Sequence, residues 1–201
     1  MSLRIMGAIA CALFIHASLS AQEVFSLGPR VGVNFANVSN VDDSKAATGL
    51  VLGLTSTYSI SETVGITLDI LYSQEGYKIE NVSDEVSLDY VQIPLYFDVF
   101  FGDLGQSFRP KIYIGLSPGI LMKAEVGDLD IKDDTRSLVL DLSGGLGFNY
   151  RLSDLIWLNV DLRSFIGLSD VRDQDLVDLQ GGDKIAARNV QLSAGIAFGL
   201  F

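Results

Sequence analysis

The fold of this 201-residue chain is decided by the stretch Val64-Gly65-Ile66-Thr67-Leu68-Asp69-Ile70-Leu71-Tyr72-Ser73. All of its even-numbered side chains are aliphatic or aromatic, whereas most of the odd-numbered ones are small or polar. Successive side chains of a β-strand point to opposite faces, so this period of two predicts a strand with one apolar face. A helix would instead scatter Thr67 and Asp69 into its apolar stripe.

Seven further stretches show the same alternation, each with one apolar parity and one parity rich in Gly, Ser, Thr and Asn. Pro94 lies within one of them and predicts a bulge or local bend. We therefore expect eight strands, which leave no room for a second domain. The strands are expected at 27–35, 50–59, 64–73, 91–101, 111–123, 138–149, 156–167 and 189–198.

The first residues have the pattern of a cleaved secretory signal peptide. Arg4 gives a positive start, an apolar run follows at 5–15, and small residues precede the expected cleavage after Ala21, with Ser20 as the alternative. The apolar run is shorter than the roughly 20 residues of a membrane-spanning helix. The chain is thereby divided into a signal peptide, 1–21, and a barrel domain, 22–201.

Composition excludes several classes of function. Cys11 and His16 are the only cysteine and the only histidine, and both lie in the predicted signal peptide. The mature chain is therefore expected to lack disulfides, Cys/His zinc sites and imidazole bases, which argues that the protein is not an enzyme. The net charge of −11 does not suit nucleic acid, because phosphate binding needs clustered Lys and Arg.

Eight antiparallel strands in up-and-down order can close into a barrel without free edges. In a soluble barrel the second parity would face water and carry many Lys and Glu. Here that parity is mostly small and polar, which suits a narrow, packed lumen and leaves the aliphatic parity to face lipid. The sequence predicts an all-β, eight-stranded antiparallel transmembrane barrel in the outer membrane. A soluble periplasmic, lipocalin-like barrel for a small apolar ligand is the alternative.

Connector lengths independently favour the membrane barrel. Short links at 60–63, 102–109 and 151–154 alternate with long stretches. Outer-membrane barrels have short periplasmic turns and long extracellular loops, so both termini are expected in the periplasm. The long stretches are 37–48, 78–87, 124–136 and 169–187. Aromatic girdles are expected from Phe35, Tyr72, Tyr77 and Tyr90 at the long-loop rim, and from Tyr58, Phe100, Phe101, Tyr150 and Phe201 at the short-turn rim.

The lumen parity contains charges of both signs. An unpaired charge in a narrow, low-dielectric barrel would cost several kcal/mol, so we expect these groups to pair. We interpret them as a structural salt-bridge plug rather than as a gated or proton-binding lumen, because eight strands leave no open aqueous channel. The predicted lumen charge network is Arg30, Asp69, Asp98, Lys111, Asp141, Asp161 and Arg163.

The long stretches are rich in acidic residues. Oxygen clusters of this kind can bind Ca²⁺ weakly, bridge to lipopolysaccharide phosphates or bind a protein partner. The segment 128–134 lacks the Gly and the terminal Glu of an EF-hand loop, so solvated, mobile loops are the favoured interpretation. The acids are Asp42, Asp43, Glu80, Asp84, Glu85, Glu125, Asp128, Asp130, Asp133, Asp134, Asp170, Asp173, Asp175, Asp178 and Asp183.

Several short motifs, taken in order, resemble the PorT-like outer-membrane β-barrel proteins of Gram-negative bacteria. They are GPRVGVNF at 28–35, DILYSQEG at 69–76, YVQIPLYF at 90–97, YIGLSPG at 113–119, GLGF at 145–148 and the terminal Phe201. The resemblance covers nearly the whole mature chain. It implies residence in the outer membrane, no cofactor and a link to protein export.

Phe201 also resembles the terminal signal by which the barrel-insertion machinery recognises its substrates. It departs from that signal in one respect, because the outward residues Leu192, Ile196, Phe198 and Leu200 lie on the opposite parity. Either a kink at the end of the chain brings Phe201 onto the outward face, or Leu200 acts as the terminal signal residue in its place.

These patterns together predict a non-catalytic outer-membrane barrel with a structural or interaction role, which presents acidic loops outside the cell. The resemblance to PorT-like proteins implies in addition that it assists protein export. Its expected partners are membrane lipid, the insertion machinery and a protein bound through the loops. The second alternative is an outer-membrane enzyme that works without histidine, through an unusual Asp/Ser arrangement.

Overall fold

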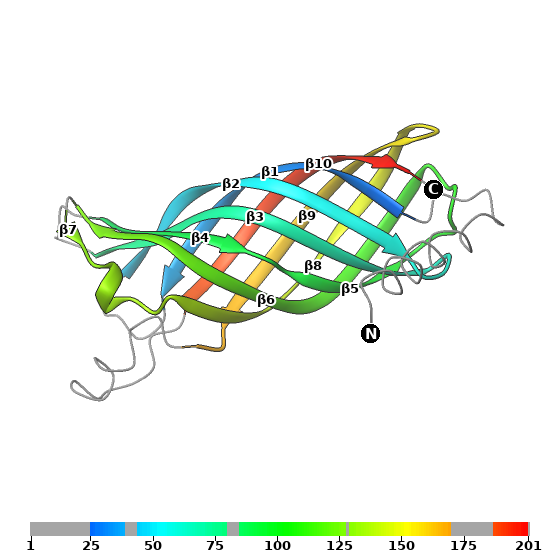
Figure 1. Cartoon of the computed structure of the whole chain (residues 1–201). Coiled ribbons are helices and arrows are strands. Elements are labelled where there is room, and N and C mark those ends of the chain that lie inside the picture. Colours follow the sequence, from blue (N-terminus) through cyan, green and yellow to red (C-terminus); the bar gives the residue numbers. More distant parts are fainter. Residues whose placement is uncertain (1–24, 39–43, 80–84, 128, 170–186, 201) are drawn as a thin grey trace, which may run out of the picture.

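The computed structural model describes residues 25–38, 44–79, 85–127, 129–169 and 187–200. The predicted signal peptide, Phe201 and most of the loop acids lie outside these residues. The described chain forms one antiparallel sheet in which β1 (Phe25–Val38) pairs with both β2 and β10, so the sheet closes on itself (Figure 1). The predicted eight-stranded barrel is confirmed. None of the helices described is long and apolar enough to span a membrane.

Two of the strands form a single barrel strand. The regular ladder is interrupted at Ile93 and Pro94, between β4 and β5, where the sequence predicts a bulge or bend, although Ile93 still donates to Pro118 and Pro94 accepts from Asp69. Proline has no N–H to donate to a ladder, which accounts for the interruption. The remaining bounds are β2 Ser44–Ser59, β3 Val64–Ile79, β4 Glu85–Gln92, β5 Leu95–Phe100, β6 Phe108–Val126, β8 Leu138–Ser153, β9 Ile156–Gly167 and β10 Ala187–Gly199.

The strands run further toward the long-loop end than the sequence predicts. β2 already begins at Ser44, β3 continues to Ile79, and the 19-residue β6 is longer than the 9–11 residues that cross a bilayer. Beyond it, β7 (Leu129–Asp130) pairs back onto β6, and the 3₁₀ helix η1 (Lys132–Asp134) follows. The predicted connector at 124–136 is thus partly ordered secondary structure, at the left end of Figure 1.

The aliphatic parity faces outward over the whole barrel wall. Leu54, Ile114 and Leu146 are 52%, 59% and 59% exposed, and they belong to a continuous band of exposed Leu, Ile, Val and Phe. Such a band would be a large apolar patch in water but is suited to lipid. The lumen holds the polar parity, which includes the buried Asn34 and Thr67. This arrangement contradicts the lipocalin-like alternative, which requires an aliphatic interior.

Strict alternation from Lys111 along β6 would point Lys123 into the lumen, but its side chain is 53% exposed. In the pairing of β4 with β6, Asp89 lies opposite Lys123 while Tyr90 lies opposite Leu121, so one residue of β6 is left over. This bulge reverses the parity of β6 beyond it. Ala124 therefore takes the buried position that strict alternation assigns to its neighbour.

Replacing Lys123 by glutamine should change the free energy of unfolding by less than about 1 kcal/mol. Within the described part of the chain, Lys123 forms an ion pair with Glu125 at 2.7 Å, largely in solvent, and exposed ion pairs contribute little. Urea unfolding of the variant in micelles checks this expectation. A loss of several kcal/mol would instead place the ammonium group inside the barrel.

Two of the predicted girdle aromatics point into the lumen. Tyr90 and Phe100 are buried because they share the parity of Gln92 and Asp98, which also face inward. The expected girdle positions on the outer surface are occupied by Phe35 and Tyr72 at the long-loop rim and by Tyr58, Phe101 and Tyr150 at the short-turn rim. The side chain of Tyr77, like Phe201, lies outside the described residues.

Gly28 lies at the seam between β1 and β10 that closes the barrel. A Cβ atom at this position would meet the backbone carbonyl of Ile196 and the Cα atom of Ala197, so the two strands can approach only because residue 28 lacks a side chain. We expect Gly28→Ala to cost about 1–3 kcal/mol, as overpacking does in other close-packed interiors. The measurement is urea unfolding. Leu27→Ile, on the lipid side of the same strand, serves as the control, and equal stability of the two variants would contradict the close approach.

Candidate functional site: the barrel lumen

The centre of the lumen is filled by ion pairs between side chains from five strands of the sheet. Asp161 on β9 accepts a hydrogen bond from Arg30 on β1 at 2.6 Å and lies 3.1 Å from the ammonium group of Lys111 on β6. Asp69 on β3 accepts from Arg163 on β9 at 2.6 Å, and Asp98 on β5 lies 3.6 Å from Lys111. Each of these side chains is almost fully buried. We call Arg30, Asp69, Asp98, Lys111, Asp161 and Arg163 the ion cluster.

The ion cluster contains three cations and three carboxylates, so its formal charges cancel. Arg30 also donates to the hydroxyls of Thr55 and Ser193, both at 3.1 Å, and Arg163 donates to the Tyr113 hydroxyl at 3.3 Å. The guanidinium of Arg163 further lies 4.8 Å from the centre of the Tyr96 ring. Charge balance and added hydrogen bonds are what a buried ion network needs to offset its desolvation.

The seventh predicted residue, Asp141, lies in a different part of the lumen. It is buried on β8, opposite Ser117 in the strand register, and closer to the long-loop end than the ion cluster. Alternation places Asp141 correctly on the inner face. The alternation does not show how far along the barrel axis Asp141 lies, because that position depends on the stagger between neighbouring strands.

A second polar layer contains a carboxylate that the sequence analysis did not single out. Glu75 on β3 is buried and accepts hydrogen bonds from Ser73 at 3.0 Å, from Gln92 at 2.8 Å and from Asn189 at 3.3 Å. Ser73 in turn accepts from Asn34 at 2.7 Å. The signal was present, because Glu75 continues the parity of Asp69 and Ser73, but the strand was predicted to end at residue 73.

An apolar cluster closes the long-loop end of the lumen. Val86, Leu88 and Tyr90 of β4 pack against Leu121 and Ala124 of β6, and Ile131 and Val139 lie against them. In this upper part of the barrel the inward parity of β4 is apolar, with Val86, Leu88 and Tyr90. The lumen therefore changes along its axis from the ion cluster, through the hydrogen-bonded polar layer around Glu75, to apolar side chains.

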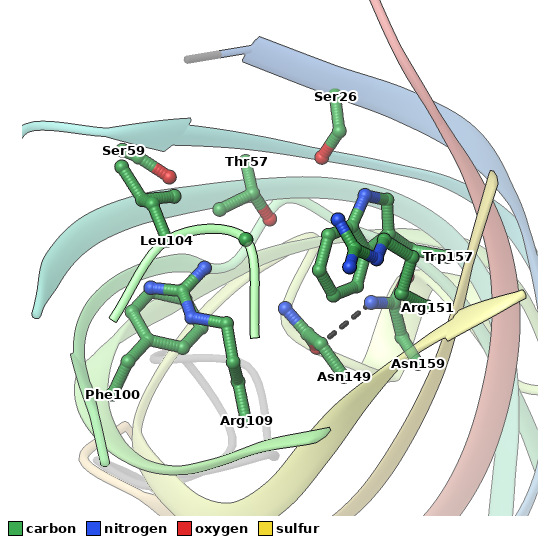
Figure 2. Close-up of a pocket in the computed structure, with 11 residues that line it drawn as sticks. Ser26, Thr57, Ser59, Phe100, Leu104, Arg109, Asn149, Arg151, Trp157 and Asn159 are labelled. Carbon is green, nitrogen blue, oxygen red and sulfur yellow. Dashed lines mark hydrogen bonds between the residues drawn. The ribbon is translucent and has the colours of Figure 1, made fainter. Parts of the chain in front are cut away.

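The short-turn end contains a pocket of about 130 Å³ (Figure 2). Two arginine–aromatic pairs form its sides: the guanidinium carbon of Arg109 lies 4.3 Å from the centre of the Phe100 ring, and that of Arg151 lies 5.9 Å from Trp157. Between them, the Asn159 side chain donates to Asn149 at 2.8 Å. Arg109 was predicted to lie in a connector, although its parity with Lys111 points it into the lumen.

The described residues offer little for catalysis. They contain neither His nor Cys, and no group of three acidic side chains among them is placed to hold a metal ion. The buried hydroxyls of Ser143 and Ser193 bond to Tyr96 and Arg30. What the lumen does provide is a rigid, neutralised interior and one polar pocket at the short-turn end.

Comparison with known families agrees with this architecture. The sequence profile of the family described as "Outer membrane protein beta-barrel domain" matches residues 20–173, which is most of the chain. The chain belongs to this family. Together with the outward aliphatic face, this places the protein in the outer membrane. By the rule for such barrels, the short-turn end faces the periplasm and the long-loop end faces the exterior.

Solved structures of outer-membrane barrels share the fold of this family member. The crystal structure of Neisserial surface protein A superimposes with a TM-score of 0.58 at 17% identity, covering 90% of this chain and 100% of that one. OprG from Pseudomonas aeruginosa superimposes with a TM-score of 0.57 at 15% identity, covering 87% and 94%. Identities this low show the fold alone. No curated protein matches the chain by sequence.

Proposed function

We propose that the protein is a non-catalytic, PorT-like outer-membrane barrel that serves as a structural and interaction component and assists protein export. The observation that carries the proposal is the ion cluster, in which three cations and three carboxylates neutralise one another inside the barrel. Because these pairs fill the middle of the lumen, we expect function at the ends of the barrel.

Acidic groups at the long-loop end are the proposed contact with a protein partner. Among the described residues there, Asp130 and Asp133 are exposed on β7 and η1. Exposed acids held on ordered backbone favour a basic partner surface and weak binding of Ca²⁺. The insertion machinery and membrane lipid complete the proposed set of partners.

The export role is tested by deletion and complementation in the native bacterium. Loss of the gene should reduce the proteins that reach the medium, and the wild-type protein and Asp154→Asn should restore them. Asp154 is an exposed acid of the short β8–β9 turn, so it controls for the loss of one charge. The double variant Asp130→Asn, Asp133→Asn should not restore export. Addition of Ca²⁺ should change export by the wild type and by Asp154→Asn, which both keep these two acids, and not by the double variant.

The same strains test the absence of catalysis. Mass spectrometry of outer-membrane lipids and peptides should give identical profiles with and without the protein. Normal export in the deletion strain would refute the export role, and a lipid species that disappears on deletion and returns with the wild type would support the enzyme alternative.

A further inference from the structure

We propose that the pocket at the short-turn end binds a periplasmic ligand through a terminal oxyanion, a carboxylate or a phosphate group. The pocket lining contains two arginines and no Asp or Glu, in a chain whose net charge is −11. It thus concentrates positive charge at the periplasmic mouth of an acidic protein. This differs from the ion cluster deeper in the lumen, where each cation has a carboxylate beside it.

Arg109 is buried, and the carboxylates of Asp103 and Glu62 attract its charge without forming an ion pair with it within 4 Å among the described residues. Its Nη2 donates to the backbone carbonyl of Glu62 at 2.6 Å and its Nε to that of Gly102 at 3.3 Å. Its Nη1 has no acceptor in the described part of the protein. A buried guanidinium needs a counter-charge, and backbone carbonyls supply only part of it. A bound oxyanion would complete both the charge and the hydrogen bonds.

Arg151 faces the same pocket from β8 and is half-buried beside Trp157. Within the described residues its guanidinium makes no hydrogen bond or ion pair. Both arginines lie against aromatic rings, an arrangement that restricts their rotamers before a ligand arrives. Preorganised guanidinium forks match carboxylate and phosphate groups in geometry and lose less entropy on binding.

Neutral polar groups complete the site. Asn149 uses its side-chain oxygen to accept from Asn159, and its amide nitrogen points toward the pocket (Figure 2). The hydroxyls of Ser26, Thr57 and Ser59 line the opposite side. A cavity of about 150 Å³ accommodates benzene. A pocket of 130 Å³ therefore holds an oxyanion with a few attached atoms, while the rest of a longer ligand extends into the periplasm.

The fluorescence of Trp157 provides a direct test, because it is the only tryptophan and forms one wall of the pocket. The protein is purified from outer membranes in a neutral detergent and titrated with acetylglycine, with inorganic phosphate and with the uncharged methylamide of acetylglycine. We expect a saturable change with at least one of the two anions and none with the methylamide. A response to acetylglycine alone assigns a carboxylate, as at a peptide C-terminus, and a response to phosphate alone assigns a phosphate-bearing ligand.

Arg109→Gln and Arg151→Gln should each weaken binding by about tenfold or more, since each removes charge-assisted hydrogen bonds. Lys123→Gln removes one positive charge at the other end of the barrel and should leave the affinity unchanged.

A heat-dependent shift on a gel verifies that each variant is folded. Arg151→Gln loses no hydrogen bond within the described protein, so it remains informative if Arg109→Gln does not fold. The proposal is overturned if neither fluorescence nor calorimetry shows saturable binding of either anion at tens of millimolar, if the methylamide binds equally, or if Arg151→Gln binds like the wild type.

Discussion

Replacing Asp161 by alanine should lower the free energy of unfolding by about 3–5 kcal/mol, because it removes one side of a buried ion network and leaves the other side uncompensated. Asp161 is fully buried and lies within 4 Å of Arg30, Lys111 and Arg163. No other carboxylate of the ion cluster contacts all three cations. Urea unfolding in micelles, followed by Trp157 fluorescence and by the heat-dependent gel shift, measures the loss.

Two further variants separate this effect from the loss of an aspartate as such. Asp154→Ala, in an exposed turn, should change stability by less than about 0.5 kcal/mol. Adding Arg30→Met to Asp161→Ala removes the cation whose shortest ion pair is with Asp161, while Asp69 keeps Arg163 and Asp98 keeps Lys111. The second substitution should therefore recover part of the loss, so the two are not additive. Wild-type stability of Asp161→Ala, or an additional full loss in the double variant, would show that the cluster is not a neutralised network.

Replacing Leu162 by arginine should cost about 2–4 kcal/mol, the cost of an arginine on the lipid face of a barrel near the bilayer midplane. Leu162 lies between Asp161 and Arg163 on β9, points outward and is 46% exposed. It therefore sits at the height of the ion cluster, on the other side of the wall. Unfolding in lipid vesicles measures the effect under the conditions in which it arises.

Leu155→Arg is the matched control for depth. Leu155 is 56% exposed in the short turn between β8 and β9, where an arginine reaches water and should cost about 0–1 kcal/mol. The two substitutions are chemically identical, so their difference reports the environment alone. If both variants were as stable as the wild type, the aliphatic face would be in water and not in lipid.

The alternation of side chains predicts the barrel well because lipid and lumen make opposite demands on one strand. From Leu27 through Phe35, and again along β9, exposed and buried side chains alternate as the parity predicts, although the inward Trp157 and Phe165 are apolar. The same rule assigns all seven predicted lumen charges to the interior. Parity is a local property, and each residue reveals its face without reference to distant parts of the chain.

The features that the sequence analysis missed depend on contacts between strands. The bulge that exposes Lys123 arises from the pairing of β4 with β6, and nothing in the run around Met122 signals it. The position of Asp141 apart from the ion cluster depends on strand stagger. Glu75 and Arg109 lie beyond the predicted ends of their strands, where pairing with a neighbour extends the ladder further than alternation alone indicates.

The layers of the lumen suggest a division of labour along the barrel axis. The ion cluster and the apolar cluster of Val86, Leu88, Tyr90, Leu121 and Ala124 make the interior rigid and closed. The periplasmic pocket and the exposed acids of β7 and η1 are the parts free to meet ligands and partners. The proposed oxyanion site and the proposed export role thus occupy opposite ends of the protein and can be tested independently.

The central claim is that the strands close a barrel in the outer membrane with the aliphatic face toward lipid. Cell fractionation, followed by electrophoresis of the outer-membrane fraction with and without boiling, tests it most directly. We predict that the protein is found in this fraction and that the unboiled sample runs as a compact band whose mobility changes on heating, because a closed barrel satisfies all its backbone hydrogen bonds in lipid and resists detergent. A soluble periplasmic protein whose mobility is unchanged by boiling would contradict the account.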